Sequence, residues 1–533
     1  MDRCELKKLR RASFGSISVW KIRWKHFRAA PQEHTQFLQL FDNFGGGSSY
    51  NDGMKNALCL LGAVAWLAGS RAAADPKWAV HEWGTFTALQ DESGDAIGGI
   101  NTDDEPVPPF VHRLDAFVVL SPSEVPGNYF QGAPSCHPDV TMRLETPVIY
   151  FHPPQSAVGV QTARVRVTFR GGWLSEFYPA ADLAVPGLEN GRFQFGRLLA
   201  ETESKLTWND LKIGGDWPVT DTSARVWTAP RAVQSASVRT TGGESEKFLF
   251  YRGVAHIDAP LRVSRDALSG ELQFRSQLAE MPLDRPLRID SLWLVDIRPG
   301  GKIAFRPLPA LSLDHAAGKP LMRTPADFAP ADFAPGNLDK LKATLRSALA
   351  ADGLFDDEAR ALLNTWELSY FKSTGLRVFF LVPRAWTDFY LPLEISQPAD
   401  VNRVMVGRIE LVTPSQRKIL REISGFSTYE ILQDAVQLQQ NYFRRYLAGA
   451  RADSGDSGLS QLHREMAQVN AGQKALSSVV SVPKTYQTYL DLGRFRNALV
   501  LETLRGHPTE GLTNFIATYR LQAYQPAAAP ARL

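Results

Sequence analysis

The chain has 533 residues, with 59 Lys and Arg against 56 Asp and Glu, which gives a formal net charge of +3. Charged residues make up 22% and hydrophobic residues 44%, which excludes wholesale disorder. The length allows two or three domains with cores of their own. No phosphate-binding glycine loop, nucleotide fingerprint or haem motif occurs in the sequence, so we expect neither a nucleotide nor a haem cofactor.

A secretory signal peptide is predicted at residues 54–74. Lys55 supplies a positive start, an apolar run of 13 residues follows from Ala57 to Gly69, and small residues at 72–74 form a cleavage site. Such a run is too short to span a bilayer, which takes about 20 apolar residues. We therefore expect an exported protein, periplasmic or extracellular, with no stable membrane span and a mature start at Asp75.

Residues 1–53 precede this leader and contain 9 Lys and Arg against 5 Asp and Glu. They are either an upstream translation artefact, with Met54 as the true start, or a basic extension that binds anionic lipid or nucleic acid. We favour the artefact, because a signal peptide works at an N-terminus. The residues from Asp75 on hold 48 Lys and Arg and 51 Asp and Glu, a net charge of −3, which gives no reason to expect nucleic acid as a partner.

Residues 75–324 show the period-two pattern that is typical of β-strands. Val165, Val167 and Phe169 alternate with polar residues, and pairs of glycines separate several similar short runs. Many short strands with frequent turns predict a β-rich, sandwich-like domain. A tandem Pro-Ala-Asp-Phe-Ala repeat follows, and we interpret residues 325–336 as a proline-rich linker or a surface crossing between two domains.

The pattern changes after this linker. Leu338, Leu341, Leu345 and Leu349 form a helical stripe, and Leu362, Leu363, Trp366 and Tyr370 give the buried face of a second helix. Strands are expected at 376–382 and 404–411, and the run Thr413-Pro414-Ser415-Gln416 predicts a capped helix start. Residues 337–524 are therefore predicted as a mixed α+β, helix-rich domain and 525–533 as a loose tail. The expected fold class is α+β.

Side chains that can bind a metal are concentrated near the mature N-terminus. They are His81, Glu82, Asp103, Asp104, Glu105, His112, Glu145 and His152. Imidazole and carboxylate are the ligand types for zinc, iron or manganese. We predict His81 and His112 as metal ligands, with Asp104 or Glu105 as the carboxylate ligand. Glu82 or Glu145 would then be the general base of a metal-assisted reaction.

A purely structural interpretation of these residues remains open. No second histidine lies four residues after His81, so this is not the helical zinc-protease motif. If residues 80–87 form a strand, His81 and Glu82 face opposite sides of it. His81 would then only hydrogen-bond a backbone group, and the acidic turn at 103–105 would only be solvated.

Three strings carry a resemblance to a known group of proteins: HEWGTFT at residues 81–87, ETPVIYF at 145–151 and RVMVGRIE at 403–410. In them the chain resembles a family of secreted bacterial proteins of unassigned activity. The resemblance spans most of the mature chain and supports a mature start near Trp78. It implies no catalytic residue.

Two functions of different class follow from the sequence. The first is a secreted metal-assisted hydrolase that acts on an extracellular polymer. The second is a non-catalytic envelope or glycan-binding protein. Exposed faces of tryptophans such as Trp173, Trp208, Trp217 and Trp227 would stack on sugar rings, while packing in the core explains most tryptophans equally well. The oligomeric state does not follow from the sequence.

Overall fold

The structure is a computed structural model, and it describes residues 77–100, 107–114, 137–154, 159–189, 192–193, 196–316, 318–447 and 482–523. The upstream extension at 1–53, the leader at 54–74 and the tail at 525–533 lie outside these ranges. The described residues belong to one compact unit that begins at Asp75.

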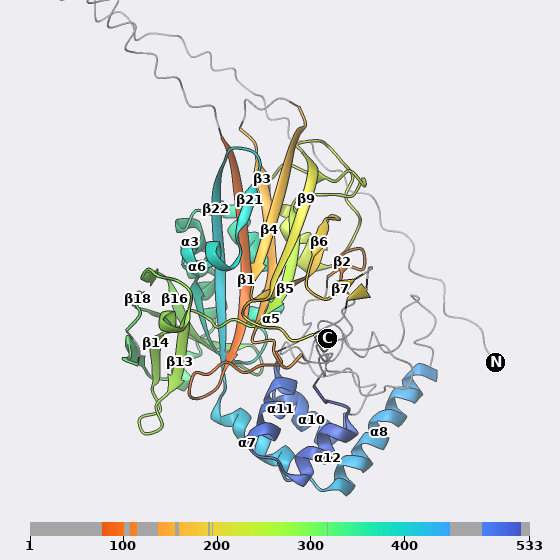
Figure 1. Ribbon diagram of the computed structural model, residues 1–533. Coiled ribbons are helices and arrows are strands. Elements are labelled where there is room, and N and C mark those ends of the chain that lie inside the picture. Colours follow the sequence, from red (N-terminus) through yellow and green to blue (C-terminus); the bar gives the residue numbers. More distant parts are fainter. Residues whose placement is uncertain are drawn as a thin grey trace, which may run out of the picture. The chain divides into compact units, whose positions relative to one another are not determined.

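A nine-stranded sheet forms the centre of this unit (Figure 1). Its strands, in spatial order, are β17 (Lys302–Leu308), β16 (Leu292–Arg298), β20 (Gly375–Leu381), β22 (Ala399–Leu411), β1 (Trp78–Gln90), β3 (Met142–His152), β12 (Leu249–Ala255), β5 (Gly172–Tyr178) and β2 (His112–Arg113). β1 pairs parallel to β22 and antiparallel to β3. Every residue of β1 from Val80 on is buried, because both faces of the sheet are covered.

A six-stranded sheet packs on one face of this central sheet, as in a sandwich. Its strands are β4 (Gln161–Arg170), β6 (Asp182–Ala184), β9 (Glu203–Ile213), β10 (Val238–Arg239), β11 (Ser245–Glu246) and β21 (Leu393–Ile395). The predicted alternation in β4 is confirmed, since Val165, Val167 and Phe169 are buried. They share one core with Val80 and Phe86 of β1.

Smaller elements complete the β-rich part. The short sheets comprise β13 (Leu261–Arg265), β14 (Leu272–Ser276) and β19 (Met322–Thr324); β15 (Leu287–Ile289) and β18 (Leu311–Leu313); and β7 (Leu188–Glu189) and β8 (Arg192–Phe193). Three single turns of 3-10 helix lie at η1 (Pro230–Ala232), η2 (Leu278–Glu280) and η3 (Pro330–Asp332).

Helices cover the second face of the central sheet. They are α2 (Arg225–Thr228), α3 (Asn337–Ala351), α4 (Asp356–Thr365) and α5 (Glu367–Phe371). The predicted stripe is confirmed for Leu341, Leu345 and Leu349, which pack in one core with Trp83 of β1. The predicted buried face that ends at Tyr370 is confirmed as well.

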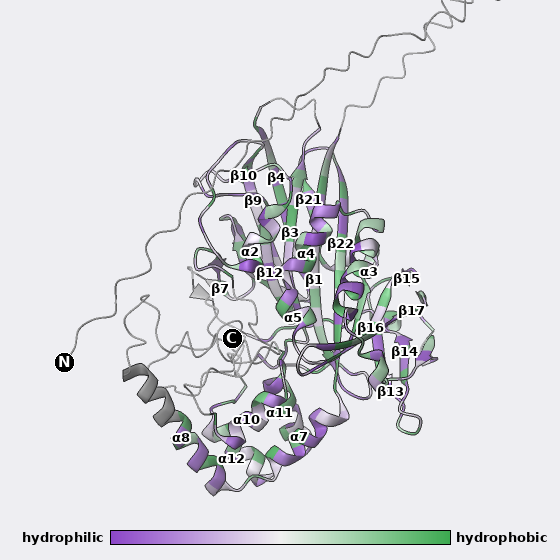
Figure 2. Cartoon of the chain, turned by 180° about the vertical axis from the view of Figure 1, so that it is seen from behind, coloured by the Kyte–Doolittle hydropathy of each residue, from purple (hydrophilic) through white to green (hydrophobic). Residues whose placement is uncertain are grey.

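A group of C-terminal helices packs around a core of its own, which Leu89 of β1 also joins. They are α7 (Pro414–Ser424), α8 (Thr428–Leu447), α10 (Lys484–Asp491), α11 (Arg496–Gly506) and α12 (Glu510–Thr518), while α6 (Arg384–Tyr390) packs on the two sheets. Hydrophilic and hydrophobic residues alternate along α7 and α12, as expected for helices with one buried side (Figure 2). The predicted cap of α7 is confirmed, because the backbone N–H of Gln416 donates to Thr413 Oγ1 at 3.2 Å.

The proline-rich segment 325–336 does not separate two sheets. Ala326 and Phe328 are buried in the core between the sheets, and the guanidinium of Arg306 lies over the Phe328 ring at 4.1 Å. β20 and β22, which come after the segment, pair with β16 and β1, which come before it. The predicted domains 75–324 and 337–524 thus share one sheet, so the repeat is a packed surface crossing.

Gly407 lies at a crowded point of the central sheet, and we expect its replacement by Ala to destabilise the protein. It pairs with Phe86 on β1 and with Phe380 on β20, and the ring centroids of these two phenylalanines lie 5.8 Å apart. An added Cβ would overlap the Phe380 ring. Gly407→Ala should lower the free energy of unfolding by about 1–3 kcal/mol in urea denaturation. Gly506→Ala is the control, since no atom lies within 4 Å of its added Cβ; an equal loss there would contradict this packing argument.

No helix among the described ranges is long and apolar enough to cross a membrane.

Candidate metal centre

Two histidines meet at one end of the strand pair β1 and β3. In the register of this pair His81 lies opposite Tyr150, and His152 lies opposite Ala79. The two histidines are therefore diagonal neighbours on one face of the sheet. Their ring centroids lie 5.1 Å apart in an edge-to-face arrangement.

Glu358 joins them from the first turn of α4. A glutamate at the third helical position can reach back to the backbone before the helix, and here the Phe355 amide donates to Glu358 Oε2 at 2.7 Å. The same oxygen lies 2.8 Å from His81 Nδ1, and Glu358 Oε1 lies 2.9 Å from His152 Nε2. One carboxylate thus contacts both imidazoles, each through a different oxygen.

The surroundings of these three residues are mostly apolar. The Phe355 ring lies 4.5 Å from the ring of His81 and 4.9 Å from that of His152, and Phe355 is 47% exposed. On the inner side, the buried Tyr150 donates its hydroxyl proton to the Pro230 carbonyl at 3.0 Å. The group therefore lies just below the surface, with Phe355 between it and solvent.

Charge and hydrogen bonding keep Glu358 ionised. Burial by itself would raise the pKa of this carboxyl group. Hydrogen bonds with His152 and His81, the charge of His81 and the Phe355 amide outweigh burial, so the pKa of Glu358 lies below its ordinary value. An ionised carboxylate at neutral pH is the form that binds a metal ion.

The three side chains fit a divalent transition metal. One ligand atom from each of His81, His152 and Glu358 can be chosen so that all lie within 4.8 Å of one another. Two imidazoles and one carboxylate are the protein ligands of several catalytic zinc sites and of many non-haem iron sites. Ligand atoms at tetrahedral zinc are about 3.3 Å apart, so the side chains would have to adjust, with separations of up to 4.8 Å closing toward that value.

His112, predicted as the second histidine ligand, does not belong to this group. Its Nε2 lies 2.9 Å from both carboxylate oxygens of Glu244, and its ring stacks on Phe177. It sits on β2, four strand positions from β1, which corresponds to roughly 19 Å across the sheet. The predicted carboxylate ligands Asp104 and Glu105 lie outside the described residues.

Neither predicted general base lies at the centre. Glu82 faces the opposite side of β1, where it is fully buried and accepts hydrogen bonds from Arg403 Nε at 2.5 Å and Tyr251 Oη at 2.6 Å. The predicted opposite orientation of His81 and Glu82 is thereby confirmed, but Glu82 is committed to these two partners.

Glu145 is held equally firmly elsewhere. It stands seven residues before His152 on β3, roughly 23 Å away along the strand. Arg494 Nη2 and Thr87 Oγ1 donate to it at 2.5 and 3.0 Å. Burial raises its pKa, but surrounding arginines, Arg494 foremost, lower it to about 2, so it is a weak base.

Two members of the group were not predicted as ligands. The sequence marks His152 as a side chain that can bind a metal but does not assign it to the site. The signal for it is its place at the end of a strand next to β1, where an antiparallel pairing brings it to His81. Glu358 had only the signal of an acid in the first turn of a helix, which usually reflects the helix dipole.

The tryptophans proposed to stack on sugars are mostly core residues. Trp173, Trp208 and Trp227 are fully buried, and the indole nitrogens of Trp208 and Trp227 donate to Pro179 O and Glu246 Oε2. These three therefore offer no surface to a glycan. Trp217 keeps part of its surface in contact with solvent.

No protein-family model and no curated protein matches the chain. Among solved structures, the Fcho1 Mu homology domain from Danio rerio with bound Eps15 peptide has a likeness to it, with 9% sequence identity and a TM-score of 0.26. The alignment covers 64% of this chain and 100% of that one. A likeness this weak carries no argument about fold or function.

Proposed function

We propose that the protein is an exported, metal-assisted hydrolase of an extracellular polymer, whose metal ion is held by His81, His152 and Glu358. The observation that supports it is the meeting of two imidazoles and a carboxylate from β1, β3 and α4. Three protein ligands leave a fourth position for water or substrate, which distinguishes catalytic from structural zinc sites. A zinc ion bound there would supply a water of lowered pKa.

The chain's own residues have separate tasks in this proposal. His81 and His152 would bind the metal as neutral imidazoles, and Glu358 would contribute the negative charge. Phe355 packs on both rings and is the partly exposed side chain over the centre, so a substrate would approach past it. Glu82 and Glu145 have no part in the reaction, since each is committed elsewhere.

The alternative is a purely structural bridge. The distances of 2.8 and 2.9 Å are ordinary hydrogen-bond lengths, so Glu358 could simply link two strands to α4. Such a role suits the non-catalytic envelope protein that the sequence left open. Metal content distinguishes the two functions.

Metal analysis is the test. The protein from residue 75 on would be purified without chelators, incubated with zinc and desalted. We expect it to retain about one zinc ion per chain, as measured by inductively coupled plasma mass spectrometry. Glu358→Gln keeps the size of the side chain but removes the charged ligand, so it should lose at least nine-tenths of this metal. His152→Ala should do the same.

His112→Ala is the matched control, because it also removes a histidine that contacts a glutamate, at the far edge of the same sheet. Its metal content should equal that of the parent. Circular dichroism would show that each variant is folded. A folded parent that retains no zinc, iron or manganese would contradict the proposal, and so would a Glu358→Gln variant that keeps its metal. Hydrolysis is then assayed as release of soluble fragments from dye-labelled polysaccharides and casein, with and without a chelator.

A further inference from the structure

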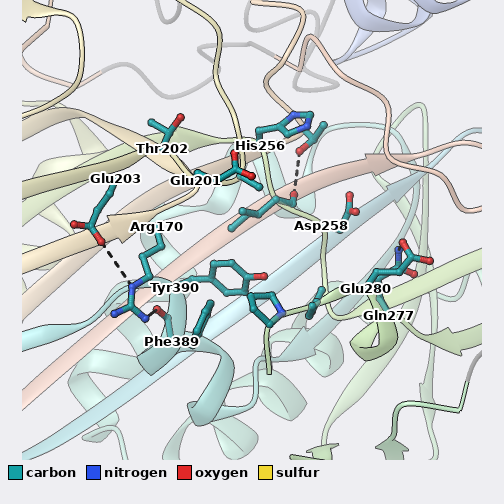
Figure 3. A pocket seen from close by; sticks show the side chains of 15 residues that line it. Arg170, Glu201, Thr202, Glu203, His256, Asp258, Gln277, Glu280, Phe389 and Tyr390 are labelled. Atoms are coloured by element: carbon teal, nitrogen blue, oxygen red, sulfur yellow. Dashed lines mark hydrogen bonds and ion pairs between the residues drawn. The ribbon is translucent and has the colours of Figure 1, made fainter. Parts of the chain in front are cut away.

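A pocket of about 360 Å³ lies on the β-rich part, away from the metal centre, and the functions proposed above make no use of it (Figure 3). Its walls come from the start of β3, the end of β4, the loop before β9, the segment after β12, η2 and the end of α6. One part of the lining is apolar, with Ile257, Met281 and Pro282 beside the aromatic Phe389 and Tyr390.

The charged residues of this pocket are mainly acidic. Its lining contains Glu201, Glu203, Asp258 and Glu280 against one arginine, Arg170, and one histidine, His256. Arg170 is already engaged, because its Nε lies 3.8 Å from Glu203 Oε2 and its Nη1 donates to the Phe389 carbonyl at 3.0 Å. Glu203 is further paired with Lys205 at 2.7 Å.

The other three carboxylates of the pocket form no ion pair with a described residue, and only the more distant charges of His256 and Arg262 oppose the rise in the pKa of Asp258. In the described part of the chain, no Lys or Arg nitrogen lies within 4 Å of the carboxylate oxygens of Glu201, Asp258 or Glu280. Glu280 accepts a hydrogen bond from Gln277 at 2.9 Å, while Asp258 accepts none from any described residue. The loss of hydration in the pocket and the neighbouring charge of Glu280 raise the pKa of Asp258 above its ordinary value.

An unpartnered hydroxyl group on a nearly buried side chain is the independent sign of a ligand. Tyr390 is only 6% exposed, and its ring packs between Trp386 and Phe389. Its hydroxyl has no hydrogen-bond partner among the described residues, and Figure 3 shows it directed into the pocket, toward the side of Asp258. Loss of hydration, and the negative charge of Asp258, raise the pKa of Tyr390 to about 12, so the hydroxyl stays protonated. The hydroxyl therefore offers an unused donor and acceptor to a molecule that enters the pocket.

We propose that this pocket binds a small organic ammonium ion, a primary amine or diamine on an alkyl chain. Asp258 and Glu280 would hold the ammonium group, the Tyr390 hydroxyl would bond to it or to its bound water, and the apolar wall would contact the alkyl chain. A bare metal ion fits less well, since among the described residues only His81, His152 and Glu358 bring three ligand atoms within 4.8 Å.

Isothermal titration with 1,4-diaminobutane, and with 1,4-butanediol as its neutral isostere, tests this proposal on the protein from residue 75 on. We expect the diamine to bind and the diol to give no measurable heat. Asp258→Asn and Glu280→Gln should each weaken diamine binding at least tenfold. Tyr390→Phe, which keeps the packed ring, should weaken it several-fold.

Glu510→Gln is the control, because it removes one exposed carboxylate at the start of α12 and should bind the diamine like the parent. Glu358→Gln should also bind it normally, so the pocket and the metal centre are tested separately. Equal heats from diamine and diol would overturn the proposal, as would an Asp258→Asn variant with parental affinity. Binding of Ca²⁺ without binding of the diamine would overturn it too, and would assign the pocket to an inorganic cation.

Discussion

Replacement of Glu82 by Ala is expected to lower the free energy of unfolding by about 3–5 kcal/mol, one of the largest effects of any single substitution in this protein. Glu82 lies fully buried between the two sheets, where Arg403 Nε and Tyr251 Oη donate to it. Without this carboxylate, the half-exposed Asp388, at 3.1 Å, is the one ionic partner that Arg403 keeps among the described residues. Taking one member from a buried ion pair costs much more than the pair itself contributes.

Urea denaturation at pH 7 would measure this loss. Lys77→Ala is the matched control, because it breaks an ion pair of similar length, 3.2 Å to Asp400, between two exposed side chains at the start of the same strand pair. That variant should stay within about 0.5 kcal/mol of the parent. Comparable losses in Glu82→Ala and Lys77→Ala would show that burial does not govern the strength of these pairs.

Acidification is expected to cost roughly 3 kcal/mol of unfolding free energy through Glu145 alone. Burial would raise the pKa of this group, but Arg494, Arg143, Arg408 and Arg252 lower it from 4.5 to about 2 in the folded protein. A pKa that folding depresses stabilises the fold above the pKa of the unfolded chain. The contribution is therefore complete above about pH 5 and disappears as the pH falls from there toward 2. Glu358, whose pKa is also lowered, adds to the loss in the same range.

The test is a series of urea denaturations between pH 7 and pH 2. Glu145→Gln should be less stable than the parent at pH 7, because Arg494 loses a buried anionic partner. Its stability should fall less steeply with acid, so that the two curves converge. Glu394→Gln removes an exposed carboxylate that lies 3.5 Å from Arg166, and its curve should run parallel to that of the parent. A Glu145→Gln curve parallel to the parent's would contradict the assignment.

Much of the local structure could be predicted from the sequence, because it depends on neighbouring residues. The alternation around Val165, the helical stripe from Leu341 to Leu349 and the cap at Thr413 each reflect a contact between residues a few positions apart. The domain boundary could not be predicted in this way. A proline-rich repeat looks the same whether it joins two domains or crosses the surface of one, and only the pairing of β22 with β1 distinguishes the two cases.

The metal centre, too, could be predicted only in part, because it joins residues that are far apart in the chain. His81 was correctly placed among the candidate ligands, and its orientation followed from strand geometry. Nearness in sequence then favoured His112 over His152, although the sheet places β3, and not β2, beside β1. Glu358 is 277 residues from His81 along the chain, so only the packing of α4 on the sheet could reveal it.

The parallel pairing of β1 with β22 has a consequence for how the protein can be made. Glu82 and Arg403, which meet across these two strands, are 321 positions apart in the chain. An emerging polypeptide must therefore keep its first strand without a neighbour on that side until residues 399–411 have left the ribosome or, if it is exported, the translocation channel. Pairing between two strands that are so far apart in the chain is slow. Until it occurs, the unpaired edge of β1 can pair with a strand of another molecule. Chains that stop short of residue 399 would present that edge permanently.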